Sequence, residues 1–253
     1  MAKSLVIDGG GYVGVELAEG REDVFDVTLV EPREAFVHAP AMLRALVDPT
    51  VRDQALIPYD KLLSKGRLVR AKATEIKPNA VVAVGEEIAA DYIVLSTGAS
   101  NGGIFKPGDE SIDSFRAAQA KVQAQIEAAA RIVIVGAGAV GTELAGEIAH
   151  AHMGKSVSLI SADATLFPSF PAKFGGGLAS KLGKMGVDVV RGARVTDLKS
   201  TTEPYAGSVT LGTGRVIEAD LDIPAVGSKP QTALFDSLPD VTRGADGRVK
   251  VDD

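Results

Sequence analysis

The feature that most constrains the fold of this chain is a glycine-rich segment that occurs twice. Residues 6–18 read VIDGGGYVGVELA, and residues 133–145 read VIVGAGAVGTELA. Each copy places an apolar, strand-forming run before the spacing G-x-G-x-x-G and a helix-forming run after it. A strand, a tight glycine turn and a helix in this order begin a βαβ unit with parallel strands. The repeat therefore predicts two α/β units of the same design.

A second match supports the repeat. Residues 91–98 (DYIVLSTG) and residues 220–227 (DLDIPAVG) follow their glycine motifs at nearly the same distance. We expect two Rossmann-like three-layer α/β domains, the second inserted in the first. The first domain would comprise residues 1–105 and 229–253, and the second would comprise residues 106–228.

Other segments complete the expected secondary structure. Residues 114–131 are rich in Ala and Gln with apolar residues at helical spacing, so we expect a helix that leads into the second unit. Residues 67–95 and 187–223 alternate short β-forming runs with turns, which indicates an antiparallel addition to each parallel sheet. Residues 101–103 and 175–177 are glycine-rich. We interpret the first as a loop and the second as a flexible loop or a weakened helix start.

The glycine motif is typical of dinucleotide binding. Its first glycine allows the tight turn, its second leaves room for a pyrophosphate against bare backbone, and its third lets helix and strand pack closely. The helix N-terminus then offers unpaired N–H groups and a partial positive charge. The alternative is a pair of tight structural turns in a protein that binds nothing. The candidate residues are Gly9, Gly11 and Gly14 in the first unit and Gly136, Gly138 and Gly141 in the second.

An acidic residue distinguishes the first unit from the second. Glu31 closes the strand after the first helix, at the place where a carboxylate binds ribose hydroxyls. The equivalent strand of the second unit ends at Ser161, and the nearest acid is Asp163. A carboxylate there would favour NAD and a basic residue would favour NADP. Ser161 decides neither, so NADH and NADPH both stay open, with a slight preference for NADH.

Composition excludes several classes of function. The chain carries 33 acidic and 27 basic residues, so there is no basic excess to neutralise nucleic-acid phosphates. It has no cysteine, which excludes disulfides, thiolate metal sites and cysteine nucleophiles within these residues. His150 and His152 would point to different sides of a helix, so we expect no metal site.

Targeting signals are absent from the N-terminal residues. Strand-forming residues follow Met1–Ser4 at once, without the apolar region and cleavage site of a signal peptide. No apolar run approaches the roughly 20 residues that span a bilayer. We expect a cytoplasmic protein without a transmembrane segment. Peripheral membrane contact and a homodimer both stay open.

Together these motifs resemble those of the FAD-dependent pyridine nucleotide oxidoreductases, which use the first loop for FAD and the second for NAD(P)H. Residues 34–45 (EAFVHAPAMLRA) are similar to a segment of the apoptosis-inducing-factor-2-like branch. That branch comprises NAD(P)H:quinone oxidoreductases and neighbours the type II NADH dehydrogenases. The resemblance implies that the glycines of the first motif and Glu31 hold the ADP part of FAD, with Thr97 and Gly98 near the FAD.

The resemblance also extends to the second unit. It implies that the glycines of the second motif and Gly227 lie along the nicotinamide cofactor, and that Glu143 lies near the nicotinamide. A solvated helix face is the alternative for Glu143. His38 and Arg44 are candidates for contact with a cofactor phosphate or the acceptor, and Lys106 for reaching the flavin. The alternative for these three is a solvated loop side chain.

The activity that the resemblance implies is hydride transfer from NAD(P)H to flavin. Disulfide reductases of this group pass the electrons on to a cysteine pair, which this chain lacks. We therefore expect direct transfer to a small electron acceptor such as a quinone. The cofactors carry the chemistry, so we assign no catalytic side chain.

Two features support an alternative function. Members of the family continue past a segment like residues 244–253 into a Gly-Asp motif, whose Asp binds the ribityl chain, and then into a C-terminal domain. We expect this chain to lack both the motif and the domain. Asp8 stands at a normally apolar place, where a carboxylate would repel a pyrophosphate or be held protonated by burial. The alternative is a non-catalytic or truncated dinucleotide-binding module without stable FAD.

Overall fold

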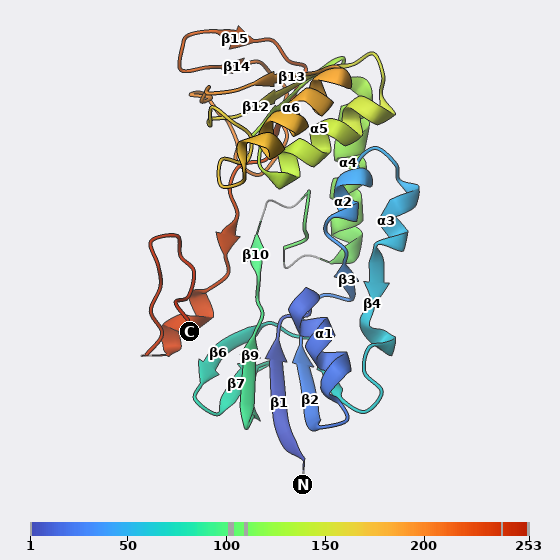
Figure 1. The fold of residues 1–253 in the computed structure, drawn as a ribbon. Helices are drawn as coiled ribbons and strands as arrows, with labels where there is room; N and C mark the ends of the chain where they lie inside the picture. Colours follow the sequence, from blue (N-terminus) through green and yellow to red (C-terminus); the bar gives the residue numbers. More distant parts are fainter. Residues whose placement is uncertain (1, 101–103, 109–110, 239, 252–253) are drawn as a thin grey trace.

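Two parallel sheets organise the molecule (Figure 1). The computed structural model describes residues 2–100, 104–108, 111–238 and 240–251. One sheet has the strand order β5-β2-β1-β9, and the other has the order β13-β12-β11-β16. The strands of the two sheets occupy equivalent places in equivalent order. The structure therefore confirms the α/β fold class and the internal repeat.

The first unit has three layers. Its sheet consists of β1 (Lys3–Asp8), β2 (Phe25–Val30), β5 (Arg67–Val69) and β9 (Tyr92–Leu95). Helix α1 (Tyr12–Arg21) covers one face, where Ile7 packs with Ala18. The other face carries the antiparallel sheet of β6 (Ala73–Lys77), β7 (Ala80–Ala83) and β8 (Glu86–Ala89), where Val6 packs with Val81. Because side chains alternate along β1, both faces of this apolar strand are buried.

The second unit repeats this design. Its sheet consists of β11 (Arg131–Val135), β12 (Ser156–Ile160), β13 (Val187–Val190) and β16 (Leu221–Pro224). Helices α5 (Ala139–Ala151) and α6 (Ala172–Lys184) pack on one face around Ile134 and Leu144. The short hairpin of β14 (Val209–Thr210) and β15 (Val216–Ile217) packs on the other face around Val133. The expected antiparallel additions to both sheets are thus present.

The chain passes between the units twice, side by side. Strand β10 (Ala99–Ser100) leaves the first unit, and β17 (Lys229–Pro230) returns antiparallel to it. The 3-10 helix η2 (Ala233–Ser237) then packs against β6, where the Ser237 hydroxyl donates to the carbonyl of Ile76 at 2.8 Å. This return is what an inserted second domain requires. The exact domain boundaries stay a prediction.

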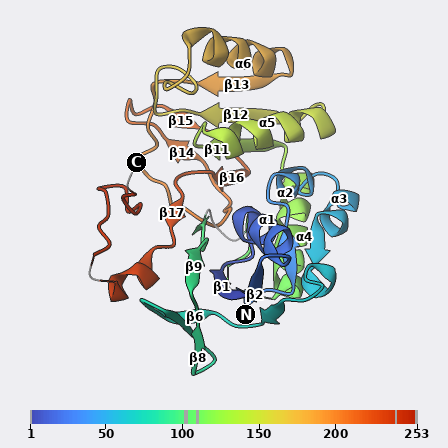
Figure 2. The same ribbon diagram turned by 60° about the horizontal axis from the view of Figure 1, so that its bottom comes forward.

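The long helix α4 (Ile112–Ala128) contacts both units. Its residue Phe115 shares a buried cluster with Met42 of α2 (Ala41–Arg44), whereas Ile126 belongs to the core beneath α5. Leu43 and Leu46 from the α2 region reach that same core. The remaining elements of this region are β3 (Ala35–Val37), α3 (Thr50–Gln54), β4 (Leu56–Pro58) and the 3-10 helix η1 (Tyr59–Lys61). Figure 2 shows α2, α3 and α4 grouped beside α1.

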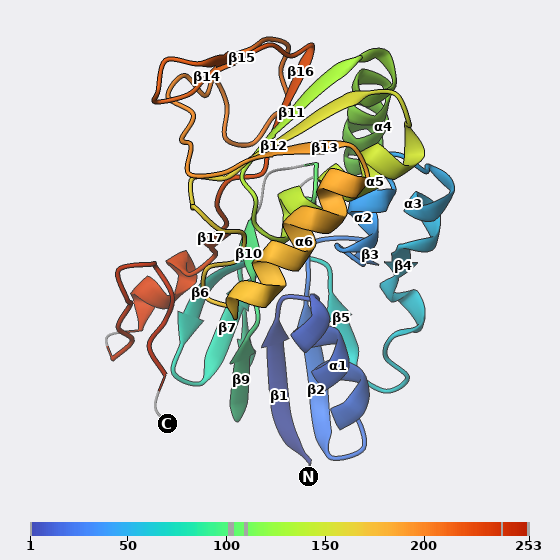
Figure 3. The same cartoon turned by 45° about the horizontal axis from the view of Figure 1, so that its top comes forward.

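The structure decides between the two interpretations of residues 175–177. They lie in the first turns of α6 (Figure 3), so the helix start is correct and the flexible loop is not. A Cβ at Gly175 would lie 2.0 Å from the carbonyl oxygen of Leu166, so glycine lets α6 approach that segment closely. The predicted loop at residues 101–103 lies outside the described residues. Within the described part of the chain, no helix combines the length and apolarity needed to cross a membrane.

Candidate functional site

The first glycine loop joins β1 to α1 and passes beneath the end of β9. Gly9 has φ +103°, and a Cβ on it would lie 2.5 Å from the carbonyl oxygen of Ser96. A Cβ on Gly14 would lie 1.8 Å from the carbonyl oxygen of Gly9. The Ser96 hydroxyl donates to that same carbonyl at 2.8 Å. The fold itself therefore requires glycine at the first and third positions of the motif.

The second loop has the same geometry. Gly136 has φ +110°, and a Cβ on it would lie 2.4 Å from the carbonyl oxygen of Ala225. A Cβ on Gly141 would lie 1.9 Å from the carbonyl oxygen of Gly136. Ala225 thus occupies the place of Ser96. Residues 91–98 and 220–227 match in sequence because each ends a strand directly over the first glycine of its motif.

The second glycine of each motif differs from the other two, because neither packing nor backbone conformation requires a glycine there. A Cβ on Gly11 or Gly138 would meet no described atom within 4 Å. Their φ angles of −76° and −74° are open to any residue. They are the N-caps of α1 and α5, and no side chain of the described residues caps either helix. Two uncapped helix N-termini thus face open space, as anion binding to backbone N–H groups requires.

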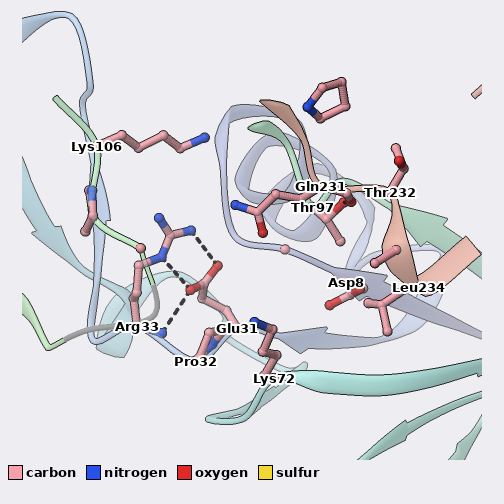
Figure 4. Close-up of a pocket in the computed structure, with 15 residues that line it drawn as sticks. Asp8, Glu31, Pro32, Arg33, Lys72, Thr97, Lys106, Gln231, Thr232 and Leu234 are labelled. Carbon is pink, nitrogen blue, oxygen red and sulfur yellow. Dashed lines mark hydrogen bonds and ion pairs between the residues drawn. The ribbon is translucent and has the colours of Figure 1, made fainter. Parts of the chain in front are cut away.

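Glu31 follows β2 and is held beside the first loop. Its carboxylate is 1% exposed and accepts from the backbone N–H of Gly10 at 2.6 Å. Arg33 donates to it from Nε at 2.7 Å and from Nη2 at 3.0 Å (Figure 4). Burial opposes ionisation, but the hydrogen bonds and charge of Arg33 outweigh it and lower the pKa of Glu31 below its ordinary value. Glu31 is therefore an anion at neutral pH.

Two contacts at this loop were missed from the sequence. The Tyr59 hydroxyl donates to the carbonyl of Gly10 at 2.5 Å, and a Cβ on Gly10 would lie 2.7 Å from that hydroxyl. The unbroken run of three glycines was the available signal for Gly10. No local pattern indicated Tyr59, because it reaches the loop from η1. Arg33 was missed as well, although it lies two residues after Glu31.

Two cavities flank the first loop. One has a volume of roughly 260 Å³ and is lined by Asp8, Gly9, Glu31 and the returning segment Pro230–Leu234. The other has a volume of roughly 270 Å³ and is lined by Gly11, Tyr12 and Phe36 among others. The residues that line both cavities are Arg33, Thr97 and Lys106. The structure thus places Gly9, Gly11, Glu31, Thr97 and Gly98 in the walls of these two cavities, whereas Gly14 lines neither.

Thr97, Gly98 and Lys106 lie at the junction of these cavities. The Thr97 hydroxyl donates to the carbonyl of Gln231 at 2.6 Å, so it ties the first unit to the returning segment. Gly98 has φ +72°, and a Cβ on it would lie 3.2 Å from Lys106 Nζ. Burial, followed by the charge of Arg33, lowers the pKa of Lys106. His38 lies at the Tyr12 side, where its Nδ1 is 2.9 Å from the Tyr12 hydroxyl.

Arg44 and Glu143 lie in a separate cavity of roughly 650 Å³, which is lined by residues of α2, α5 and α6 together with Phe167 and Met185. Arg44 Nη2 donates to Glu147 at 2.9 Å, which joins α2 to α5. Burial, followed by the charge of Glu147, raises the pKa of Glu143. Gly227 follows β16 with φ +72°, in the place that Gly98 takes after β9. Contact of Arg44, Glu143 and Gly227 with a cofactor stays a prediction.

Metal binding has no visible support in this geometry. Among the described residues, no group of three or more His, Cys, Asp and Glu side chains is placed to hold a metal ion. His150 lines the α2–α5–α6 cavity, and His152 ends α5.

Comparisons with known proteins support the interpretation of the two glycine loops. The sequence profile of the pyridine nucleotide-disulphide oxidoreductases matches residues 58–253. The apoptosis-inducing factor homolog B of Dictyostelium discoideum is 31% identical, over 98% of this chain and 70% of that protein. An FAD-dependent oxidoreductase of Flammulina velutipes is 34% identical, over 80% of this chain and 64% of that protein.

A solved structure gives the same fold. The NAD-dependent persulfide reductase of A. fulgidus superimposes with a TM-score of 0.76 at 23% identity, over 98% of this chain and 50% of that one. The chain thus spans about half the length of that structure. The match supports the fold, and the profile and relatives support the family.

These comparisons confirm the predicted family and, at the level of the family, its cofactors. Its members and neighbours bind FAD and NAD(P)H, including a water-forming oxidase solved with NADH and an engineered form of it solved with NADPH. With two matching glycine loops, an acid after the first and the resemblance to apoptosis-inducing factor homologues, the chain belongs to the pyridine nucleotide-disulphide oxidoreductase family.

Proposed function

We propose that this chain binds FAD on its first unit and NAD(P)H on its second, and that hydride passes from NAD(P)H to the flavin. The observation that carries this proposal is the pair of second glycines. Gly11 and Gly138 are required neither by backbone conformation nor by packing, and both stand at uncapped helix N-termini. A ligand that must approach the bare backbone accounts for glycine at both places.

The first-unit residues fit the ADP part of FAD. The N–H groups at the start of α1 would hold its pyrophosphate. Glu31 would accept from ribose hydroxyls, since it is ionised and lines the cavity beside Gly9. Arg33 now donates to Glu31 from two nitrogens, so the ribose would share this carboxylate with Arg33 or displace it. Thr97, Gly98 and Lys106 would line the path toward the flavin.

The second unit would orient the nicotinamide cofactor. The N–H groups at the start of α5 would hold its pyrophosphate, and the backbone of Gly227, which has no side chain, would lie along the cofactor. Glu143 lies one turn into α5, in the cavity that Arg44 also lines. The flavin supplies the redox chemistry when bound, and these residues supply position and electrostatics.

We propose a small molecule such as a quinone as the electron acceptor. The family name refers to members that reduce disulfides, but these 253 residues contain no cysteine that could form a redox pair. Reduced flavin would then pass its electrons directly to the acceptor. The similarity of residues 34–45 to the quinone-reducing branch supports this choice. Cytoplasmic location, peripheral membrane contact and homodimer formation stay predictions.

An absorption spectrum of the purified protein tests the proposal. Flavin bands that bleach on anaerobic addition of NADH or NADPH are the expected result. The matched variants are Gly11→Ala and Gly20→Ala, because both glycines belong to the α1 region and neither would place a Cβ near a described atom. Gly11→Ala should lose flavin by blocking the approach of the pyrophosphate, whereas Gly20→Ala should retain it.

A second function is favoured by one observation. The buried carboxyl of Asp8 lines the cavity beside Gly9, where a pyrophosphate would meet it. The chain would then be a nucleotide-binding module that holds NAD(P)H on the second unit without stable flavin. A colourless protein that takes up no added FAD, but whose NADH binding is lost in Gly138→Ala, would favour this module over the oxidoreductase.

A further inference from the structure

A buried carboxyl with one oxygen that lacks a hydrogen-bond partner among the described residues lies in the first cavity. Asp8 is the last residue of β1 and is only 5% exposed. Its Oδ2 atom makes no hydrogen bond to any described residue. Figure 4 shows its side chain beside Leu234, on the side of the cavity that Thr97 and Thr232 also line. A buried polar atom without a partner costs free energy, so its presence calls for an explanation.

Charged groups from several elements face the same cavity. They are Glu31 and Arg33 after β2, Lys72 before β6, and Lys106 after β10. The residues Pro230–Leu234 of the returning segment add no charge. Burial, then repulsion by Glu31, raises the pKa of Asp8 to about 6, against a smaller opposing effect of Lys72. Asp8 therefore titrates in the range where a protein works.

The second unit provides an internal comparison. Val135 ends β11 at the place that Asp8 takes in β1, and it is buried to a similar degree. The same strand, turn and helix geometry thus forms with an apolar residue at this place. The fold does not need the carboxyl, so its effect must be sought in what occupies the cavity.

We propose that Asp8 makes occupancy of the first dinucleotide site depend on pH: the site takes its pyrophosphate cofactor with Asp8 protonated, and cofactor binding therefore takes up a proton at neutral pH. This inference rests on the proposed binding of FAD to the first unit. It concerns the regulation of that site: a change in pH would shift the fraction of the protein that holds the cofactor.

The charge balance of the cavity supports the proposal. Three basic residues line it together with Asp8 and Glu31. An ionised Asp8 would add a second carboxylate beside Glu31, next to the loop that takes the pyrophosphate, and protonation of Asp8 removes that repulsion. Glu31 cannot take the proton in its place, because Arg33 stabilises its anion. A protonated Asp8 can also donate a hydrogen bond, which gives its buried oxygen a partner.

The test is a titration with FAD, followed by quenching of flavin fluorescence, at several pH values between 6 and 8. The affinity of the unaltered protein should fall by up to about tenfold per pH unit above the pKa of Asp8. Asp8→Asn keeps the shape of the side chain without its charge, and Asp8→Val copies Val135. Both variants should bind FAD with an affinity that varies little over this range. Calorimetry in two buffers of different ionisation enthalpy should show proton uptake in the unaltered protein only.

Two controls separate this inference from the proposed function. NADH binding to the second unit should be the same in Asp8→Asn, because Val135 takes the place of the carboxyl there. His38 also lies near the first loop, but it is intact in both variants. A pH dependence that persists in Asp8→Asn would overturn the proposal and point to another group. FAD binding that is independent of pH in the unaltered protein would overturn it too. If none of the three proteins binds FAD at any pH tested, the result would instead contradict the function proposed for the first unit.

Discussion

At the scale of single residues, Glu31 holds the first loop together. Its carboxylate accepts from Gly10 and Arg33 and is almost fully buried, and Arg33 is 15% exposed. Glu31→Gln removes the charge and breaks the buried ion pair between Glu31 and Arg33. We expect a loss of roughly 3 kcal/mol in the free energy of unfolding, and loss of flavin. Urea denaturation measures the first, and the ratio of flavin to protein absorbance measures the second.

The matched control is Glu19→Gln, which removes the same charge from an exposed position on α1. Its unfolding free energy should change by less than about 0.5 kcal/mol. Equal stability of the two variants would mean that the Glu31–Arg33 pair contributes nothing to the fold.

The sequence located Glu31 but not its partners. The spacing between the first glycine and the acid is a local property of one βαβ unit, so the pattern predicts it. Tyr59 reaches Gly10 across 49 positions of the chain, and Gln231 reaches Thr97 across 134. Contacts at such separations depend on tertiary packing, which no local pattern encodes.

At the scale of elements, the glycines of α6 offer a sharp comparison. A Cβ on Gly175 would overlap the carbonyl oxygen of Leu166, whereas one on the adjacent Gly176 would meet no described atom. We expect Gly175→Ala to lower the unfolding free energy by at least about 2 kcal/mol, because backbone must move to admit it. Gly176→Ala should raise it by up to about 1 kcal/mol through better helix propensity. Thermal unfolding of both variants measures the difference, and equal melting temperatures would contradict the contact.

The helices and strands themselves were largely predictable, because each has a strong local signal. Strand β11 and helix α5 lie before and after the second glycine turn, as the motif predicts. The helix predicted over 114–131 is observed at 112–128. Ser111 starts it as the N-cap and accepts from the N–H of Ser114. The sequence could not decide between a loop and a helix start for residues 175–177, because glycine weakens helices locally and the packing that favours Gly175 is not local.

At the scale of the whole molecule, the two units meet through α2, α4 and α5. Leu43 and Leu46 enter the core beneath α5, and Arg44 pairs with Glu147 at the surface. Arg44 is 60% exposed, so this ion pair contributes little to stability and serves chiefly to orient the helices. The sequence predicted two repeated units, but α2 and α4, through which they meet α5, lie in segments outside the repeat. Their arrangement therefore could not be read from the repeat.

Acidic groups in both units make the stability of the whole molecule depend on pH. Burial raises the pKa of Asp8 and of Asp222 from 3.8 to about 6 in the folded protein. Their protonated forms contribute stability that is complete below 3.8, the pKa of the same groups in the unfolded chain, and that is lost as the pH rises through 6. Hydrogen bonds lower the pKa of Glu22 and Asp220 to about 2, so their effect is present above their unfolded pKa and is lost in strong acid. Stability without cofactor should therefore be highest at about pH 4, where these opposing effects balance.

Urea denaturation between pH 5 and pH 8 tests this expectation. The unfolding free energy should fall over this range by roughly 1.5 kcal/mol for each of the two buried acids, because about half of each effect is already lost below pH 5. Asp222 keeps its hydrogen bond from the Tyr205 hydroxyl at 2.9 Å, which offsets part of its share. Asp8→Asn combined with Asp222→Asn should flatten the profile above pH 5, because neither amide titrates. A control variant with Asp26→Asn, at an exposed position in β2, should retain the slope. If stability instead rose steadily from pH 5 to pH 8, these two carboxyls would have to be ionised in the folded protein at little cost, and the burial of Asp8 could not drive proton uptake on cofactor binding.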